Sequence, residues 1–317
     1  MTSAGERALR HVRELFPQVT PAEVPSAAIT VNFHPDRLLA DGLTVAEHLA
    51  AEGVYRSQFE TRISNGGLTA FAGGDRDGWE QRMFPGVYAG PVGRPVYGAL
   101  NLAGHPDGAS PRFGSCHLVL AAHVSQRATF SHGDSFTEPT VFGTAATFGA
   151  VWAALLDEVA GTGRALNLAA SSPAEWVRQL GADRVHAGRA MDDYVEAQVH
   201  GGITLAEDVT AVVADPGFRG TPVEAQLRGL GPPVRWAPGF VLPADDFPAD
   251  LKGPQVPPLA RAVADRYGRE VLDAALVGRA TREPRAWASF GSPAEVLQLL
   301  KYVWHILVMR GAPPGGR

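Results

Sequence analysis

Polar and apolar residues alternate most regularly in residues 194–200, where every second side chain is polar. Because successive side chains of a strand point to opposite faces, these polar groups share one face of a predicted strand. A carboxylate is costly to bury unless it gains partners, so Glu196 indicates either an open cleft or a structural ion pair. An ordinary half-exposed antiparallel strand fits the same pattern. The polar face carries Tyr194, Glu196, Gln198 and His200.

Further strands are predicted where short β-branched segments are bounded by Gly, Pro or Asp. They alternate with predicted helices in a mixed order and not as regular βαβ units, and no internal repeat is present. No G-x-G-x-x-G motif lies between a strand and a helix, so a Rossmann-type nucleotide site is not supported. The predicted strands cover residues 28–33, 96–102, 114–120, 194–199 and 209–214.

Helix starts are marked by a Ser or Thr followed three residues later by Glu, because the two residues can satisfy each other's free backbone amides. Four such pairs are Thr44–Glu47, Ser172–Glu175, Thr221–Glu224 and Ser292–Glu295. The predicted helices cover about 44–52, 145–159, 172–180, 222–229, 257–267 and 292–309, and a helix over about 5–15 is expected to be peripheral. Trp304 and His305 have apolar neighbours at helical spacing, which indicates packing roles.

These elements predict an α+β fold with a split or strongly curved mixed sheet and flanking helices. Residues 1–27 form a helical lead-in, 28–245 an α+β domain that carries the site, and 246–317 a helical segment packed on that domain. The prolines of residues 232–258 indicate a bridging segment between the last two parts.

Composition narrows the possible functions. Of 317 residues 45% are hydrophobic and 19% are charged, which is typical of a globular chain. The net charge of −5 gives no overall basic field, so constitutive binding to nucleic acid is not expected. Cys116 is the only cysteine, which excludes an intrachain disulfide and indicates a cytoplasmic protein. No stretch reaches the roughly 18 apolar residues of a membrane span, so no membrane association is expected.

Candidate site residues follow the first predicted strand and lie in later loops. His34, Asp36 and Arg37 end that strand, where polar groups often line a crevice. Arg56 offers planar donors for phosphate or carboxylate, and Tyr97 beside a glycine suits stacking on a flat ring. A structural histidine, an ordered loop and a core tyrosine are the alternatives. Metal-ligand spacings such as H-E-x-x-H are absent, so no metal is expected.

Long specific strings make the sequence resemble a bacterial family known mainly as a domain of unknown function. The resemblance covers nearly the whole chain, and the family name implies no reaction. It is carried by NFHPDR (32–37), EGVYRSQFETRISNGGLTAFAGGDRDGWE (52–80), RPVYGALNL (94–102), PRFGSCHLVL (111–120), RATFSHGDS (127–135), DDYVEAQVHG (192–201) and WHILV (304–308).

The order of elements also resembles that of ADP-ribosyltransferases. In that superfamily the first strand ends in His or Arg, a middle motif supports nicotinamide, and a late strand presents the catalytic Glu. The resemblance implies that Glu196 is catalytic and that Gln198, two residues away, influences the choice of acceptor. It also implies NAD as the substrate, bound by His34, Arg37, Arg56, Tyr97 and Ser135.

We therefore expect an ADP-ribosyltransferase-like enzyme that cleaves the nicotinamide–ribose bond of NAD. The acceptor is water or an unidentified protein, nucleic acid or small molecule. A hydrolase, with or without a metal, is the first alternative and would use His34, Asp36 and His117. A ligand-binding or interaction protein without turnover is the second. The expected cleavage of NAD requires that Glu196 and His34 face the same hollow.

Overall fold

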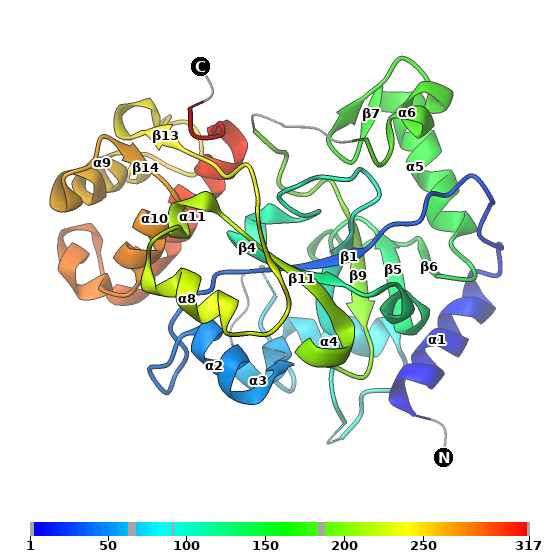
Figure 1. Cartoon of the computed structure of the whole chain (residues 1–317). Coiled ribbons are helices and arrows are strands. Elements are labelled where there is room, and N and C mark those ends of the chain that lie inside the picture. Colours follow the sequence, from blue (N-terminus) through cyan, green and yellow to red (C-terminus); the bar gives the residue numbers. More distant parts are fainter. Residues whose placement is uncertain (1–2, 63–67, 91, 183–187, 316–317) are drawn as a thin grey trace.

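The fold is built on one large mixed sheet flanked by helices (Figure 1). The computed structural model describes residues 3–62, 68–90, 92–182 and 188–315. Neighbouring strands of the large sheet are antiparallel, except for the parallel pair at its β12 edge. The predicted α+β class with a mixed sheet is confirmed. In spatial order the strands are β12 (Val234–Trp236), β11 (Val209–Ala214), β4 (Cys116–Leu120), β1 (Ile29–Phe33), β3 (Val96–Leu100), β9 (Val195–Val199), β5 (Ala128–His132) and β6 (Phe142–Thr144).

All five predicted strands form: the bounds of β11 are as predicted, and those of the other four differ by one or two residues. β4 begins two residues late because the short 3₁₀ helix η1 (Pro111–Phe113) and Gly114 precede it. The sequence did not predict β5, β6 or β12, which are short and depend on pairing with distant strands. Three small two-stranded sheets join β2 (Val54–Tyr55) to β10 (Ile203–Thr204), β7 (Arg164–Ala165) to β8 (Leu168–Ala169), and β13 (Leu242–Pro243) to β14 (Val271–Leu272).

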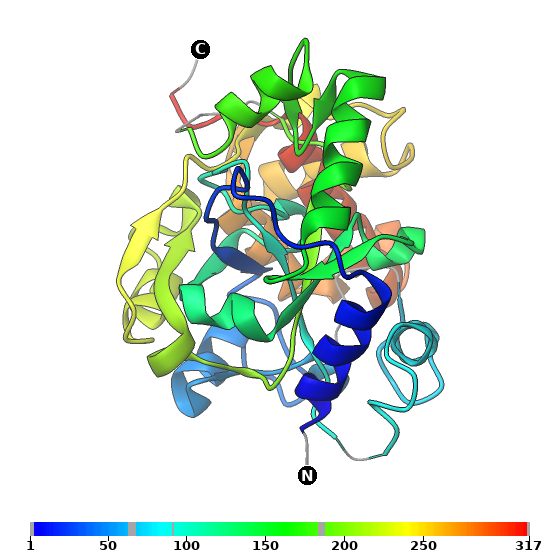
Figure 2. The same cartoon turned by 90° about the vertical axis from the view of Figure 1, so that its right-hand side faces the viewer.

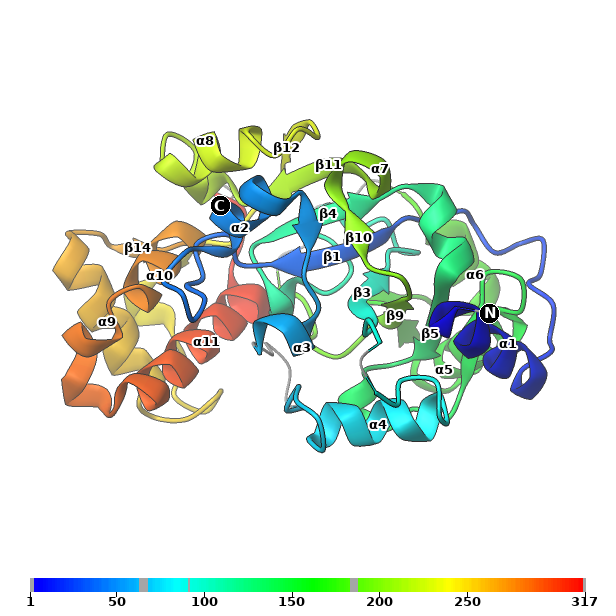
Figure 3. The same cartoon turned by 90° about the horizontal axis from the view of Figure 1, so that it is seen from below.

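The helices cover the sheet, and α2, α3 and α4 lie on the side seen from below in Figure 3. Each predicted helix is present, while α3, α4, α7 and α10 were not predicted. None of the helices in the described part of the chain combines the length and hydropathy needed to cross a bilayer. The helices are α1 (Ala4–Leu15), α2 (Val45–Glu52), α3 (Gln58–Thr61), α4 (Asp75–Met83), α5 (Gly149–Thr162), α6 (Pro173–Gln179), α7 (Leu205–Asp208), α8 (Pro222–Arg228), α9 (Val256–Tyr267), α10 (Ala274–Thr281) and α11 (Pro293–Arg310).

Two of the four predicted capping boxes form as expected, at the starts of α2 and α11. At α6 and α8 the glutamate accepts instead from the amide of the residue before the N-cap, at 2.7 Å for Glu175 and 2.8 Å for Glu224. The hydroxyl of Thr221 makes no capping bond and donates to the carbonyl of Phe218. The prediction of a reciprocal box is therefore wrong at these two helices, although the carboxylate still satisfies a free amide near the helix start.

The first helix is less peripheral than the sequence indicated. Ala8 and Val12 are fully buried, and α1 packs beside β5 and β6 (Figures 1 and 2). A Cβ at Gly5 would lie 2.8 Å from that of His200, so α1 closes over the polar face of β9. The prediction of a peripheral helix is wrong, because one side of α1 completes the cover of the sheet.

The C-terminal helices share one hydrophobic core with the sheet. The core runs without a break from β1 to α11 and includes α9 and α10. Trp304 and His305 are 1% and 3% exposed, which confirms that they are packing residues. The indole Nε1 of Trp304 donates to the carbonyl of Pro111 at 2.9 Å and so ties α11 to η1.

The central feature of the sheet is a split between β1 and β3. These strands pair only at Ile29–Leu100 and Thr30–Ala99. Beyond that point β1 continues along β4 and β3 continues along β9. Gly98 lies at the divergence, and a Cβ there would be 2.7 Å from the carbonyl oxygen of Thr30. Glycine is therefore needed where the two backbones begin to separate.

Replacing Gly98 by alanine tests this close approach. Overpacking against the Thr30 carbonyl should lower the free energy of unfolding by about 1–3 kcal/mol. Gly161→Ala is the control: no atom lies within 4 Å of its Cβ position, and alanine in a helix should stabilise by about 0.5–1 kcal/mol. Urea denaturation measures both variants. Equal stability of Gly98→Ala and the wild type would contradict the close packing at the split.

Candidate functional site

A pocket opens where the sheet splits. Its empty volume is about 1070 Å³, part of which is open to solvent. It is lined by residues at the separating ends of β1 and β3, by side chains of α2, α3 and α4, and by Glu196 of β9. Consecutive residues of each strand, Asn32 and Phe33 in β1 and Val96 and Tyr97 in β3, line it, so polar and apolar side chains both meet the pocket.

Most of the residues singled out from the sequence line this pocket. They are His34, Arg37, Arg56, Tyr97 and Glu196. Ser135 and Gln198 do not line it, but both are hydrogen-bonded to Glu196 from behind. Glu196 and His34 thus share one hollow, although they lie on strands separated by β3 in the sheet.

Glu196 is the best-positioned ionisable group of the pocket. It is 3% exposed, and both carboxylate oxygens are held. Ser135 donates to Oε2 through its hydroxyl at 3.0 Å and its amide at 3.3 Å, and Gln198 Nε2 donates to Oε1 at 3.0 Å. The Ser135 hydroxyl in turn accepts from the guanidinium of Arg76. Three donors therefore fix the carboxylate and favour its ionised form.

A series of hydrogen bonds along the same face of β9 determines which of these groups donate and which accept. The hydroxyl of Thr129 donates to Gln198 Oε1 at 2.8 Å, so it accepts from His200 Nε2 at 3.1 Å. Burial lowers the pKa of His200 to about 3, so the ring is neutral and its Nδ1 accepts from the hydroxyl of Tyr88. Each group in this series of hydrogen bonds therefore donates to the next one, and the last donor, Gln198 Nε2, donates to Glu196.

Burial and hydrogen bonding oppose each other at this carboxylate. Burial raises the pKa of Glu196 to about 7, the positive charge of Arg76 lowers it, and the neighbouring Asp134 raises it. A pKa near neutrality lets the group act as a carboxylate that stabilises positive charge and as a base that takes up a proton.

Tyr97 lines the pocket together with Arg76, which lies against its ring. The guanidinium of Arg76 lies 4.0 Å from the ring centroid, a cation–π contact. The phenol donates to the buried Glu80 at 2.7 Å, and Arg94 donates to the same carboxylate at 2.6 Å. Helix α4, which carries Arg76 and Glu80, thus holds Tyr97 in place.

Arg37 and Arg56, the two arginines predicted to bind the ligand, differ in whether a carboxylate already binds them. Arg56 is paired with Glu52 at the end of α2, with its Nε 2.8 Å from Oε2, so its guanidinium is already engaged. Arg37 has no carboxylate partner within the described residues. His34 beside it is neutral, because burial and then the charge of Arg37 lower its pKa to about 3. Arg37 is therefore the better group for an anionic ligand.

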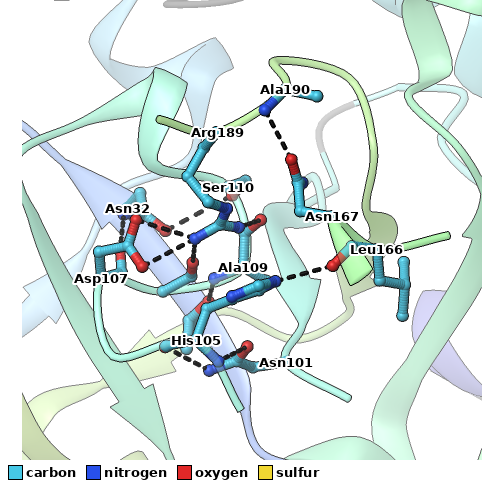
Figure 4. A network of polar contacts seen from close by, with 12 residues as sticks. Asn32, Asn101, His105, Asp107, Ala109, Ser110, Leu166, Asn167, Arg189 and Ala190 are labelled. Atoms are coloured by element: carbon cyan, nitrogen blue, oxygen red, sulfur yellow. Dashed lines mark hydrogen bonds and ion pairs between the residues drawn. The ribbon is translucent and has the colours of Figure 1, made fainter. Parts of the chain in front are cut away.

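A buried polar network supports the wall of the pocket behind β1 (Figure 4). Arg189 binds both oxygens of Asp107, at 2.7 and 2.8 Å, and donates to the carbonyl of Ala109 at 3.1 Å. Asn32 Nδ2 donates to the carbonyl of Asp107 at 3.3 Å, and Ser110 donates to Asn32 Oδ1 at 3.5 Å. The network therefore ties together two pocket residues, Asn32 on β1 and Ser110 just before η1.

The residues of the hydrolase alternative are not gathered in the pocket. Asp36 points to α10, where Gly278 has no Cβ and leaves room for its carboxylate. His117 does not line the pocket. In the ranges that the structure describes, no three His, Cys, Asp or Glu side chains form a metal-binding group.

Sequence reasoning missed Arg76, Glu80 and Asp134. Arg76 and Glu80 are four residues apart in α4 and so share a helix face, and both lie in the long string of residues 52–80. The sequence shows this spacing of four residues, but no pattern near it indicates that this face of the helix contacts Tyr97. The Gly66–Gly67 doublet of the same string lies outside the described residues.

The hydrogen-bond chain predicts the effect of Gln198→Leu. Loss of one donor to an ionised carboxylate, about 1.5–3 kcal/mol, should raise the pKa of Glu196 by about one to two units. Carbon-13 NMR of the carboxyl groups, with the Glu196 signal assigned through Glu196→Gln, measures the shift. Gln179→Leu is the control, because Gln179 donates to Ala169 at the end of α6. An unchanged titration in Gln198→Leu would show that the donor does not act on Glu196.

Comparison with known proteins agrees with the strings seen in the sequence. No curated protein matches the chain at a significant level. A family model described as "Protein of unknown function (DUF3626)" matches residues 28–310, which takes in the whole large sheet and the helices from α2 to α11. The chain therefore belongs to the DUF3626 family.

Proposed function

We propose that the pocket binds NAD and that Glu196 promotes cleavage of the bond between nicotinamide and ribose. The ADP-ribose then passes to an acceptor or to water. The observation that carries the proposal is the meeting of His34, Tyr97 and Glu196 in one pocket, with the carboxylate fixed by three donors.

The chemistry needs a fixed negative charge beside the ribose. When the bond from C1′ to the pyridinium nitrogen breaks, its electron pair neutralises the pyridinium, and nicotinamide leaves uncharged. The ribose then carries oxocarbenium character, which the Glu196 carboxylate stabilises electrostatically. The acceptor hydroxyl or a water molecule adds to C1′, and its proton passes to Glu196.

Other pocket residues suit the remaining parts of NAD. The ring of Tyr97 can offer a flat surface for nicotinamide beside Arg76, which lines the same pocket. His34 is neutral and can hydrogen-bond a ribose hydroxyl. Arg37, with no carboxylate partner among the described residues, can bind the pyrophosphate. Arg56 has a smaller part here, because Glu52 neutralises it.

Glu196→Gln tests the catalytic role. The amide keeps the shape of the side chain but removes its charge, so nicotinamide release should fall by about 10²–10³-fold. The Kd for NAD should change little, because the carboxylate acts on charge that develops in the transition state. Liquid chromatography of nicotinamide, with and without a cell lysate as a source of acceptor, measures the rate.

Glu138→Gln is the matched control for this experiment. The Glu138 side chain is 74% exposed and pairs with Arg82 at the surface, so the variant should keep the wild-type rate. Binding of NAD without release of nicotinamide under any condition would favour a binding protein without turnover. Failure of the wild-type protein to bind NAD would overturn the proposal.

The pH dependence of nicotinamide release provides a second test. The pKa of Glu196 is raised by burial to about 7, and only the ionised carboxylate is active in the proposed step. The rate should therefore be low in acid and rise as the pH passes through neutrality. Gln198→Leu should move the midpoint to higher pH. A rate that stays constant through neutral pH would contradict the assignment of Glu196.

A further inference from the structure

The wall of the main pocket has two parts that differ in composition. Arg76, Tyr97 and Glu196 come from α4, β3 and β9. The other part comes from one continuous segment, residues 39–61, which follows β1 and contains the helices α2 and α3 (Figure 3). Its aliphatic and aromatic side chains that line the pocket form what we call the apolar wall: Leu39, Val45, Leu49, Val54 and Tyr55.

The apolar wall is suited to burying a flat ring. Val45 and Leu49 are four residues apart in α2 and so share one face of the helix. The ring of Tyr55 lies edge-on to that of Phe33, with 6.1 Å between the ring centroids, and Phe33 lines the pocket as well. Removing the surface of a ring from water against such side chains is favourable, and apolar walls with few polar groups are typical of sites for small molecules.

Three polar side chains of the same segment are already bound within it. The Nε of Arg56 donates to Glu52 at 2.8 Å. The hydroxyl of Ser57 donates to Glu60 at 2.7 Å, and the hydroxyl of Thr61 donates to the carbonyl of Ser57 at 3.2 Å. These groups therefore have partners before any ligand arrives.

The side-chain oxygen of Gln58 has no such partner. Gln58 lines the pocket, and its Oε1 is buried without a hydrogen bond to any residue that the structure describes. The Nδ1 of His48 makes no hydrogen bond to those residues either, but it lies 3.6 Å from Glu52, and the Nε2 of this ring pairs with Asp41 at 2.7 Å. A buried acceptor without a donor costs about 1–3 kcal/mol. A ligand that places an N–H group beside Gln58 Oε1 removes this cost.

We propose that the apolar wall binds the adenine ring of NAD and that Gln58 Oε1 accepts a hydrogen bond from its 6-amino group. This inference rests on the proposed function, in which Tyr97 receives the other ring of NAD. An amide side chain recognises adenine because the amine donor of the ring stands beside a ring nitrogen that accepts. Gln58 is therefore a specificity-determining residue, since a purine without the amine leaves its Oε1 unpaired.

Isothermal titration of the full chain with two nucleotides tests this contact. Adenosine 5′-monophosphate carries the amine, and purine riboside 5′-monophosphate lacks it and is otherwise the same. In the wild type, loss of the amine should raise the Kd about tenfold, the value of one hydrogen bond to a buried acceptor. In Gln58→Met, which keeps the length of the side chain and removes its acceptor, the two nucleotides should bind with equal Kd.

Gln179→Met is the matched control. Gln179 donates to the carbonyl of Ala169 near the end of α6 and does not line the pocket, so this variant should keep the tenfold difference. The comparison of the two nucleotides on the wild type needs no variant and decides the question even if thermal melting shows that Gln58→Met is unfolded.

Three results would overturn the inference: no binding of adenosine 5′-monophosphate to the wild type, equal Kd values for the two nucleotides there, or an unchanged difference in folded Gln58→Met. These titrations use neither NAD nor the release of nicotinamide. Failure of the adenine contact therefore leaves the proposed cleavage standing, and a protein that recognises the amine without releasing nicotinamide would keep the contact and lose the reaction.

Discussion

The structure depends on the separation of β1 from β3 after two paired residues. Beyond these pairs each strand keeps a partner only on its outer side, β4 for β1 and β9 for β3, so residues of the two separating strands line the opening. Gly98 permits the close approach from which the strands diverge. The main pocket lies at this opening, and the fixed carboxylate of Glu196 lines it.

A balance of opposing free energies governs the site. Burial makes the charge of Glu196 costly, and the protein offsets that cost with donors from Ser135 and Gln198 and with the positive charge of Arg76. The hydrogen bonds run in one direction from Tyr88 through His200, so the orientation of Gln198 is set far from the pocket. Such a network is expected where a carboxylate must be ionised in a place shielded from water.

Local patterns in the sequence were sufficient for part of this account. The strict alternation of β9 placed Glu196 and Gln198 on one polar face, and the two lie together in the structure. The helix starts at α2 and α11 followed from capping chemistry. The pairing of Arg56 with Glu52 was not predicted, although the two residues are four apart. No local pattern contains the contact of α4 with Tyr97, because it arises only when distant segments pack.

The central claim is that Glu196 meets the ribose of NAD inside the split of the sheet. A crystal structure of the Glu196→Gln variant soaked with NAD tests this most directly, because the substitution should slow turnover and preserve the intact ligand. The account predicts the nicotinamide ribose within about 3 Å of the substituted side chain at position 196, with the ring against Tyr97. NAD bound outside this pocket, or inside it with the ribose turned away from position 196, would contradict the account.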